Sequence, residues 1–437
     1  MNAENTSLEQ VSARRKFIAN LEPSRKGFVT NYPNFQHWKK VPSEKILAPK
    51  PLNIYVHIPF CAQQCSYCYY RTITGSRKSE MDQYVNTLCR EIEIAAKRFH
   101  LNERPILSVY FGGGTPTLLG EQSLSQITET LHKHLTIDTT GEFEFTVEAE
   151  PVTMTEKKAK LLQGLGVNRI SLGVQSLCDD IIKLSNRQDT EKKVVRAIDF
   201  ARNTGASVNI DLMSGLAGET PETWAYSVKR ALSTEVESIT VYKMELYANT
   251  QYYKDLRNNK IELPSDEQEI EFMRHAIEQF EQAQYKPWCF FTFTKGGDYV
   301  HAHAPSIWRG DDYYPFGTSA FGRLGNWLFQ NTNDVEKYVS LVNAGENPIS
   351  RGHNMTCLDG MVRDVLLGLK LITLDLETFQ SRYGIKLDLL CGPTMKQLES
   401  EGFITISDRE IVLTPKGVLH GDYAGKSLAK AMLQNAA

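Results

Sequence analysis

Three cysteines lie close together in the stretch Cys61-Ala-Gln-Gln-Cys65-Ser-Tyr-Cys68. Thiolates at this spacing can hold three irons of a [4Fe–4S] cube and leave the fourth iron open to another ligand. The alternatives are a structural zinc site or a set of buried or disulfide-linked cysteines. Structural zinc normally takes four Cys or His ligands, and the sequence has no second Cys-x-x-Cys or His pair nearby. The spacing therefore favours an iron–sulfur cluster.

Glycine and polar residues follow several later apolar runs, at positions where a strand would end. The segment Phe111-Gly-Gly-Gly-Thr-Pro-Thr117 can bring backbone groups close to a ligand, because glycine has no side chain to obstruct the approach. Alone, such a segment is more often a tight strand-to-helix connection, and a lone buried polar residue is more often a satisfied core group. The polar candidates are Glu148, Glu150, Gln175, Arg187 and Asp211. Their positions at, near or just after the ends of successive runs predict that they ring one face together with the cysteines.

Short apolar runs alternate with helical stretches from Pro51 onward. The runs are residues 53–58, 106–111, 143–148, 168–174, 208–213 and 238–242, and helical character follows them, as at 80–98, 124–134 and 155–165. This alternation predicts parallel strands with crossover helices, and continuous apolar runs suit strands buried on both faces. Six units do not complete an eight-stranded barrel. We therefore predict an α/β fold with a partial (β/α)6 TIM-type barrel, whose site lies at the carboxyl ends of its strands.

Composition narrows the class of protein. The 437 residues carry a formal charge of −3 and the pI is near 6.4, so we expect no general attraction to nucleic acid or to a membrane. Eight cysteines in a chain of this length do not resemble a secreted disulfide framework, and the amino terminus lacks the apolar core of a signal peptide. No uncharged apolar run approaches the ~18 residues that span a bilayer. We expect a cytoplasmic protein.

The composition also suggests three parts. Residues 1–50 form an N-terminal strap, in which the aromatic run at 32–38 anchors by packing and the basic triplet Arg14-Arg15-Lys16 is a solvated helix face. Residues 51–333 form the partial barrel with a C-terminal extension that includes a long helix at 263–284. Residues 334–437 form a C-terminal domain.

Five stretches resemble a known superfamily. They are Tyr55-Val-His-Ile-Pro-Phe-Cys61-x3-Cys65-x-Tyr-Cys68, the Gly-Gly-Gly-Thr-Pro-Thr loop, Val-Glu148-Ala-Glu-Pro, Arg-Ile-Ser-Leu-Gly-Val-Gln175 and Asn-Ile-Asp211-Leu. From about residue 50 to 425 the chain is similar to the radical S-adenosylmethionine (SAM) superfamily and, within it, to the HemN-like group of oxygen-independent coproporphyrinogen III oxidase. The resemblance implies a [4Fe–4S] cluster on the three cysteines, with SAM chelating the open iron. One-electron reduction then cleaves SAM to methionine and a 5′-deoxyadenosyl radical, which abstracts hydrogen from a substrate.

The resemblance also assigns residues to SAM. Tyr55 would lie beside the cluster, and the loop would admit the SAM amino group to backbone carbonyls. Glu148 would pair with a positive or hydroxyl-bearing part of SAM, and Arg187 would offer a fork to its carboxylate. Gln175 and Asp211 would hydrogen-bond the ribose or methionine moiety. The loop residues are Gly112, Gly113, Gly114 and Thr115.

One position departs from the family pattern. The porphyrinogen oxidases of the group carry a further cysteine two positions after the third cluster cysteine, where this chain has Tyr70. The departure argues against simple coproporphyrinogen decarboxylation. The group also includes haem-trafficking relatives, enzymes that open the haem ring, and methyltransferases or cyclopropane-forming enzymes that use a second SAM as carbon donor. The Cys68-Tyr-Tyr70 continuation is most like the last of these.

The densest aromatic stretch lies at residues 285–322 and resembles the region that lines the substrate or second-SAM pocket. Flat side chains suit a planar substrate or an adenine ring, although an aromatic seam between domains is an equal alternative. The alternation of His301 and His303 indicates a strand, and we expect no metal there. Glu245 and Tyr247 are candidate catalytic residues, as general base or substrate anchor, with a surface role equally open. The pocket candidates are Trp308, Tyr313, Phe316 and Gly317.

The C-terminal part predicts helices at 359–371, 375–383 and 394–401, followed by a hairpin at 402–417 that turns near Asp408-Arg409. Helices followed by a hairpin make a winged-helix-like unit. Because this unit is not notably basic and ends relatives of the group as a lid, we expect a lid beside the site and not a DNA-binding module.

These observations predict an enzyme that uses a [4Fe–4S] cluster and SAM for C–C bond chemistry on a small-molecule substrate. Methyl or methylene transfer with two SAM molecules is the first hypothesis. Tetrapyrrole decarboxylation or ring opening is the second, and a haem-binding trafficking protein is the third. The enzyme would need a reducing partner such as flavodoxin or ferredoxin.

Overall fold

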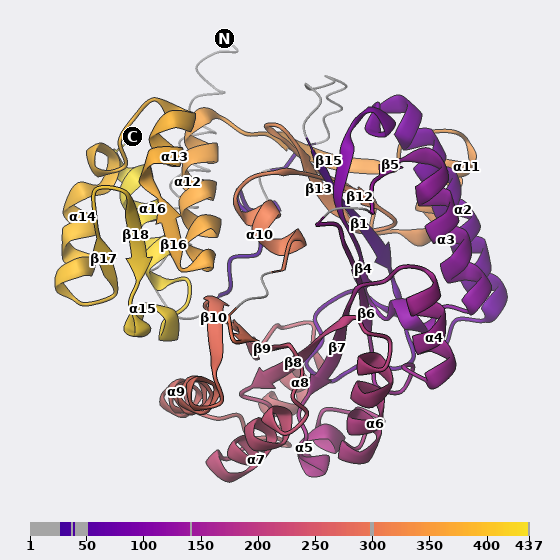
Figure 1. Cartoon of the computed structure of the whole chain (residues 1–437), viewed down its shortest axis with the longest axis horizontal. Helices are drawn as coiled ribbons and strands as arrows, with labels where there is room; N and C mark the ends of the chain where they lie inside the picture. Colours follow the sequence, from indigo (N-terminus) through magenta and orange to yellow (C-terminus); the bar gives the residue numbers. More distant parts are fainter. Residues whose placement is uncertain (1–26, 36–37, 40–50, 140–141, 298–300, 436–437) are drawn as a thin grey trace.

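The computed structural model describes residues 27–35, 38–39, 51–139, 142–297 and 301–435 (Figure 1). Its centre is a run of parallel strands that pair in chain order. The strands are β1 (Leu52–Ile58), β4 (Pro105–Gly113), β6 (Glu144–Ala149), β7 (Arg169–Gln175), β8 (Ser207–Ser214) and β9 (Ser238–Lys243). They match the six apolar runs, which confirms the predicted α/β fold with a partial barrel.

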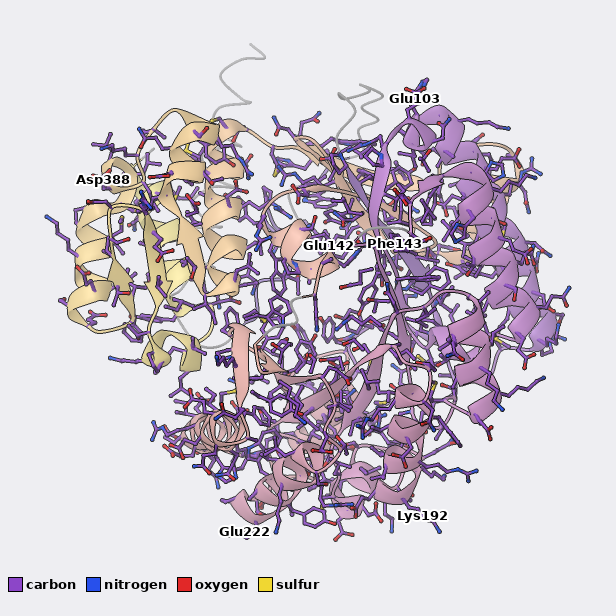
Figure 2. All side chains as sticks on the ribbon, in the orientation of Figure 1. Glu103, Glu142, Phe143, Lys192, Glu222 and Asp388 are labelled. Carbon is purple, nitrogen blue, oxygen red and sulfur yellow. The ribbon has the colours of Figure 1, made fainter. Side chains whose placement is uncertain are left out.

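Crossover helices cover the outer side of these strands (Figure 1). Several begin with a threonine whose hydroxyl accepts the N–H three residues on, such as Thr155, Thr190 and Thr220. Charged residues such as Glu103 and Lys192 project outward (Figure 2). The helices are α2 (Lys78–Arg98), α3 (Glu121–His134), α4 (Glu156–Gly164), α5 (Asp179–Leu184), α6 (Glu191–Arg202) and α7 (Pro221–Leu232).

The sheet continues past both edges of the parallel run. β12 (Asp312–Phe316) pairs parallel with β1, and three antiparallel strands follow it: β13 (Phe321–Leu324), β14 (Trp327–Asn331) and β15 (Ile349–Asn354). On the other edge, β11 (Thr292–Lys295) pairs with β9, and β10 (Tyr285–Cys289) pairs with the outer side of β11. Away from this edge, the short strand β5 (Thr136–Ile137) pairs with β4. In the described part of the chain β10 and β15 are the two ends of the strand order, so the barrel is open. The long helix expected at 263–284 is α9 (Asp266–Gln282), and α8 (Gln251–Arg257) precedes it.

The two faces of the strands differ in polarity. Leu52, Ile54 and the other outward residues of β1 pack into the helix-covered core. Many inward residues are polar although they are buried, and they bond to one another: Ser108 Oγ donates to Asn53 Oδ1 at 2.7 Å, and Ser238 Oγ to Asn209 Oδ1 at 2.6 Å. The expectation that both faces would be apolar is therefore wrong for the inner face, where short polar side chains satisfy each other.

A separate core forms at the carboxyl end of the chain. The predicted helices and the hairpin are present, and Asp375 caps its helix as expected. A third strand joins the hairpin, and a last helix closes the unit. α11 (Val335–Asn343) and β15 belong to the main body, whereas the elements from α12 onward pack around the second core, which also takes in residues 289–291. The elements are α12 (Cys357–Gly368), β16 (Thr373–Asp375), α13 (Leu376–Tyr383), α14 (Asp388–Ser400), β17 (Ile404–Ile406), β18 (Glu410–Leu413), α15 (Pro415–Leu419) and α16 (Tyr423–Asn435).

The described part of the strap is held by aromatic packing. Tyr32 lies in the C-terminal core, and Trp38 packs on Leu328 and Met355. The basic triplet Arg14-Arg15-Lys16 lies outside the described residues. Among the described helices, none is both long and apolar enough to cross a membrane.

Candidate active site

The three cysteines follow the carboxyl end of β1. Cys61 ends the short strand β2 (Phe60–Cys61), which pairs with β3 (Ile73–Thr74), and Cys68 N donates to Cys65 O at 3.1 Å in the turn that follows. All three thiols are free. The loop is clamped through its middle residue, because Ser66 N donates to Ser185 O at 3.0 Å and Ser66 O accepts from Tyr252 N at 2.9 Å.

The cysteines suit a cluster better than a single ion. Burial raises the pKa of Cys61 to about 11 and that of Cys68 to about 12, so these thiols hold their protons until iron displaces them. Among the described residues, no three Cys, His, Asp or Glu side chains are arranged to hold one metal ion. Such an arrangement is not required when each cysteine binds a different iron of one cube. The donor set therefore fits a [4Fe–4S] cluster.

The glycine-rich loop packs directly on the cysteine loop. Gly114 N donates to Ile58 O and Thr115 N donates to Phe60 O, both at 2.7 Å. A Cβ on Gly114 would lie 2.6 Å from Phe60 O and 3.0 Å from Cys61 Sγ, so only glycine fits there. The Thr115 hydroxyl points at the Cys61 sulfur at 3.6 Å. The glycine-rich loop and the cysteine loop thus lie in direct contact.

Glu148 joins the end of β6 to the same loop. Tyr110 OH donates to Glu148 Oε1 at 2.7 Å, and Gly113 N donates to Oε2 at 3.0 Å. A Cβ on Gly112 would lie 2.9 Å from that second oxygen. Burial raises the pKa of Glu148 to about 7, so the carboxyl can exchange a proton near neutral pH.

Tyr55 lies beside this group on the inner face. Its ring stacks on Tyr110 with centroids 6.0 Å apart, and its hydroxyl lies 3.1 Å from His57 Nδ1. The His57 ring in turn lies against Gly113, and burial lowers its pKa to about 4. Sequence reasoning missed Tyr110 and His57, although the period of two along each strand places both on the face that Tyr55 occupies.

Arg187 reaches the cysteine loop from the turn after α5. Its Nη1 lies 3.5 Å from Cys65 Sγ and 3.2 Å from Tyr67 OH. The guanidinium also forms ion pairs with Glu150 and Asp189. The contacts of Arg187 with Tyr67 and Asp189 are not predicted from the sequence. The signal for Asp189 is an acidic residue two positions after the arginine, close enough to pair with it.

Gln175 ends β7, and Asp211 lies within the neighbouring strand β8. Asp211 accepts from Ser171 Oγ at 3.1 Å and Asn209 Nδ2 at 2.9 Å, and burial raises its pKa to about 6. Gln175 has φ of 65°, which is strained for a residue with a side chain. Its buried Oε1 accepts no hydrogen bond from the described residues. An arriving ligand can satisfy this oxygen.

Aromatic side chains gather beside the cysteine loop. Tyr69 stacks on Tyr70 with ring centroids 4.3 Å apart, and lies 4.1 Å from the Tyr247 ring. Tyr70 is 55% exposed. Glu245 accepts the N–H of Gly27 at 3.0 Å, so this carboxylate is tied to the N-terminal strap.

The residues expected in the substrate pocket are divided among different places. Tyr313 faces inward beside Asn53, and Trp308 stacks on Trp288 at 6.0 Å. Phe316 is fully buried on the opposite, helix-covered face, because residues an odd number of positions apart on a strand point to opposite sides. Gly317, directly after β12, donates its N–H to Glu91 Oε2 on α2 at 2.7 Å.

The predicted strand through His301 and His303 is wrong. His303 begins the short helix α10 (His303–Trp308), which lies inside the barrel (Figure 1). His303 Nδ1 lies 2.7 Å from Ser108 Oγ and His301 Nε2 lies 3.2 Å from Ser238 Oγ. Both histidines therefore belong to the polar network of the inner face.

Two family models match separate parts of this chain. The model of the radical SAM superfamily matches residues 55–231, and that of the HemN C-terminal domain matches residues 358–420. The heme chaperone HemW of Bacillus subtilis is 30% identical over 371 residues, which span 84% of this chain and 96% of the chaperone. The oxygen-independent coproporphyrinogen III oxidase of Salmonella typhimurium is 28% identical over 390 residues, which span 85% of this chain and 83% of the oxidase.

A solved structure shares the fold over nearly the whole chain. It is titled "Coproporphyrinogen III oxidase (HemN) from Escherichia coli is a Radical SAM enzyme" and has a TM-score of 0.81, 24% sequence identity, and coverage of 93% of this chain and 96% of that chain. The chain therefore belongs to the radical SAM superfamily, whose cofactors are a [4Fe–4S] cluster and SAM. Within that superfamily it is a member of the HemN-like group.

Proposed function

We propose that this protein is a radical SAM enzyme that acts on a tetrapyrrole, with a second SAM as a one-carbon donor. The observation that carries the proposal is the meeting of three free cysteines, the Gly112–Gly114 loop and Glu148 at one end of the parallel strands. When bound, the cluster and SAM supply a 5′-deoxyadenosyl radical that removes a hydrogen atom from the substrate.

The residues of the chain would bind and shield SAM. Cys61, Cys65 and Cys68 would hold the cluster, and the backbone of the glycine loop would receive the SAM amino group. Glu148 already holds the loop through Gly113 N, so its second role would be to accept from SAM. The surrounding burial would exclude water from the reacting atoms.

Other strand ends would complete the SAM pocket. Asp211 would hydrogen-bond the ribose or the methionine part, and the orphaned Gln175 oxygen would accept from the same molecule. Tyr55 would lie beside the cluster. The Arg187 guanidinium would bind the SAM carboxylate after one of its ion pairs, with Glu150 or Asp189, is broken.

Two observations support a tetrapyrrole as the substrate. The relatives described above are named as a coproporphyrinogen oxidase and a heme chaperone, and both handle tetrapyrroles. In addition, the stacked rings of Tyr69, Tyr70 and Tyr247 form an aromatic face beside the cysteine loop, which suits a flat ligand. Glu245 would anchor the substrate or accept its proton. Burial raises the pKa of Tyr247 to about 12, so its protonated hydroxyl would anchor the substrate as a hydrogen-bond donor.

One-carbon transfer is proposed over decarboxylation because Tyr70 stands where the group's oxidases carry a cysteine. Trp308 and Tyr313 would border the second SAM or the far side of the substrate, and Phe316 and Gly317 would support that wall from behind. The C-terminal unit from α12 onward would close over the site as a lid. Reduced flavodoxin or ferredoxin would supply the electron.

A haem chaperone is the second candidate, favoured by the 30% identity to HemW across 96% of that chain. In this case the cluster would be retained without turnover, and the exposed Tyr70 face would hold haem.

Product analysis separates these functions. Reconstituted protein is incubated with SAM, a reductant and a tetrapyrrole, and 5′-deoxyadenosine, S-adenosylhomocysteine and the tetrapyrrole mass are measured. Both SAM products with a one-carbon mass gain are expected. Deoxyadenosine alone would support decarboxylation or ring opening, and a haem Soret band with neither product would support the chaperone.

A further inference from the structure

Arg187 links the cysteine loop to two carboxylates that the proposed function does not otherwise use. Its Nη1 lies 3.5 Å from Cys65 Sγ and 3.2 Å from Tyr67 OH. On the other side of the guanidinium, Nε lies 3.0 Å and Nη2 2.8 Å from Asp189 Oδ2. Nη2 also pairs with Glu150. The arginine side chain is 1% exposed, so these contacts define its position.

We propose that Asp189 and Glu150 are positioning residues that hold Arg187 against the Cys65 sulfur, where its N–H raises the reduction potential of the cluster. The proposal rests on the proposed function only in assuming that the three cysteines bind a [4Fe–4S] cluster.

Asp189 is placed to orient the guanidinium of Arg187. Its side chain is 0% exposed, and its Oδ2 accepts from Arg187 while its Oδ1 accepts no hydrogen bond from the described residues. Burying a carboxylate is costly unless it is paired, and here the pairing is with one guanidinium. Gly173 O accepts from Nη2 at 2.6 Å and fixes the same edge. Because the guanidinium is planar, holding Nε and Nη2 fixes the direction of Nη1, which reaches Cys65 Sγ and Tyr67 OH and also lies 3.5 Å from Glu150 Oε1.

A donor at a cluster sulfur favours the reduced state. Reduction adds one electron to the cluster, and the added negative charge is partly carried by the cysteine sulfurs, so an N–H aimed at Cys65 stabilises the product more than the reactant. Glu150 and Asp189 together carry more negative charge than Arg187 carries positive charge. If the carboxylates acted only through their charge, they would lower the reduction potential of the cluster. If Asp189 acts by holding the Arg187 N–H at Cys65, its presence raises that potential.

The test is a redox titration of the cluster, with dithionite as reductant and electron paramagnetic resonance as readout, in the absence of SAM. It compares the full-length wild type with Arg187→Lys and Asp189→Ala. The matched control is Asp180→Asn, because Asp180 is an exposed acid on the adjacent helix α5. Arg187→Lys keeps the positive charge but loses the planar fork.

The expected result is a more negative midpoint potential in both test variants and an unchanged potential in the control. An unchanged or more positive potential in Asp189→Ala would overturn the proposal. If Asp189→Ala does not retain a cluster, the midpoint potential of Arg187→Lys is used instead, and an unchanged or more positive value there would overturn the proposal. Weaker SAM binding by Arg187→Lys with an unchanged SAM-free potential would also overturn it, because Arg187 would then act on SAM alone.

Failure of the proposed function is distinguishable from failure of this inference. A wild-type protein that binds no cluster after reconstitution would contradict both. A cluster with the expected shifts but no formation of 5′-deoxyadenosine would overturn only the proposed enzyme activity.

Discussion

Gly114 packs so closely on the cysteine loop that adding one methyl group should disturb the cluster site. In Gly114→Ala the new Cβ would meet three atoms: Phe60 O at 2.6 Å, Ile58 O at 2.9 Å and Cys61 Sγ at 3.0 Å. Two of the three are backbone atoms, which cannot rotate away. The same two carbonyls accept the N–H groups of Thr115 and Gly114 at 2.7 Å, so relief of the clash lengthens these hydrogen bonds.

The expected cost follows from comparable overpacking. An added methyl in a tight site costs about 1–3 kcal/mol. If the displaced loop must be restored for the cysteines to bind iron, the same free energy weakens cluster binding by a factor of about 5 to about 150. We therefore expect a lower free energy of unfolding for the metal-free protein and less iron per chain after reconstitution.

Denaturant unfolding of the metal-free variant and the iron content of the reconstituted variant measure both effects. The matched control is Gly164→Ala, because Gly164 is the last residue of α4 and a Cβ there meets no atom within 4 Å. Wild-type stability together with full iron content in Gly114→Ala would show that the loop accommodates the added methyl group, contrary to this prediction.

Three further predictions concern buried ionisable groups and the cluster. Burial raises the pKa of Glu91 to about 7, so the folded state holds this proton more tightly than the unfolded state does. As the pH rises from about 4.5 to about 7, the unfolding free energy of the wild type should therefore fall relative to that of Glu91→Gln. The expected fall is about 3 kcal/mol at most. Denaturant titrations across that pH range would contradict this if the difference between the two proteins stayed constant. Asp422→Ala leaves Lys370 buried without its partner at 2.7 Å and should cost about 3–5 kcal/mol in unfolding free energy. Glu93→Ala, which breaks the exposed pair with Lys97, serves as its control and should change stability little, and equal effects of the two variants would argue against the account. Cys65→Ala should lose cluster absorbance while Cys357→Ala, at an exposed cysteine, retains it; cluster absorbance that survives in Cys65→Ala would show that Cys65 is not a ligand.

The parallel strands could be predicted because their signals are local. Each apolar run is continuous and is followed by a helical pattern, and the polar candidates Glu148, Gln175 and Asp211 fall at the ends of the runs. The C-terminal hairpin and the Asp375 cap could also be predicted from the sequence, because turns and caps depend on a few neighbouring residues.

Features that depend on distant pairing could not be predicted in the same way. β12 lies beside β1 although more than 250 residues separate them, and its aromatic residues do not reveal which edge they join. The expected strand at His303 fails because its imidazole bonds to Ser108 on a distant strand while the local chain turns into α10. Tyr110 and Asp189 act through partners that only the folded chain brings near, namely Glu148 and Arg187.

Reductive cleavage of SAM is the reaction that we propose for the three cysteines and the adjacent strand ends. Anaerobic incubation of the reconstituted wild-type protein with SAM and dithionite, followed by quantification of 5′-deoxyadenosine, tests it most directly. We expect 5′-deoxyadenosine from the wild type and from Cys357→Ala, and none from Cys65→Ala. A wild-type protein that carries a full [4Fe–4S] cluster and binds SAM, yet forms no 5′-deoxyadenosine with or without a tetrapyrrole, would contradict it.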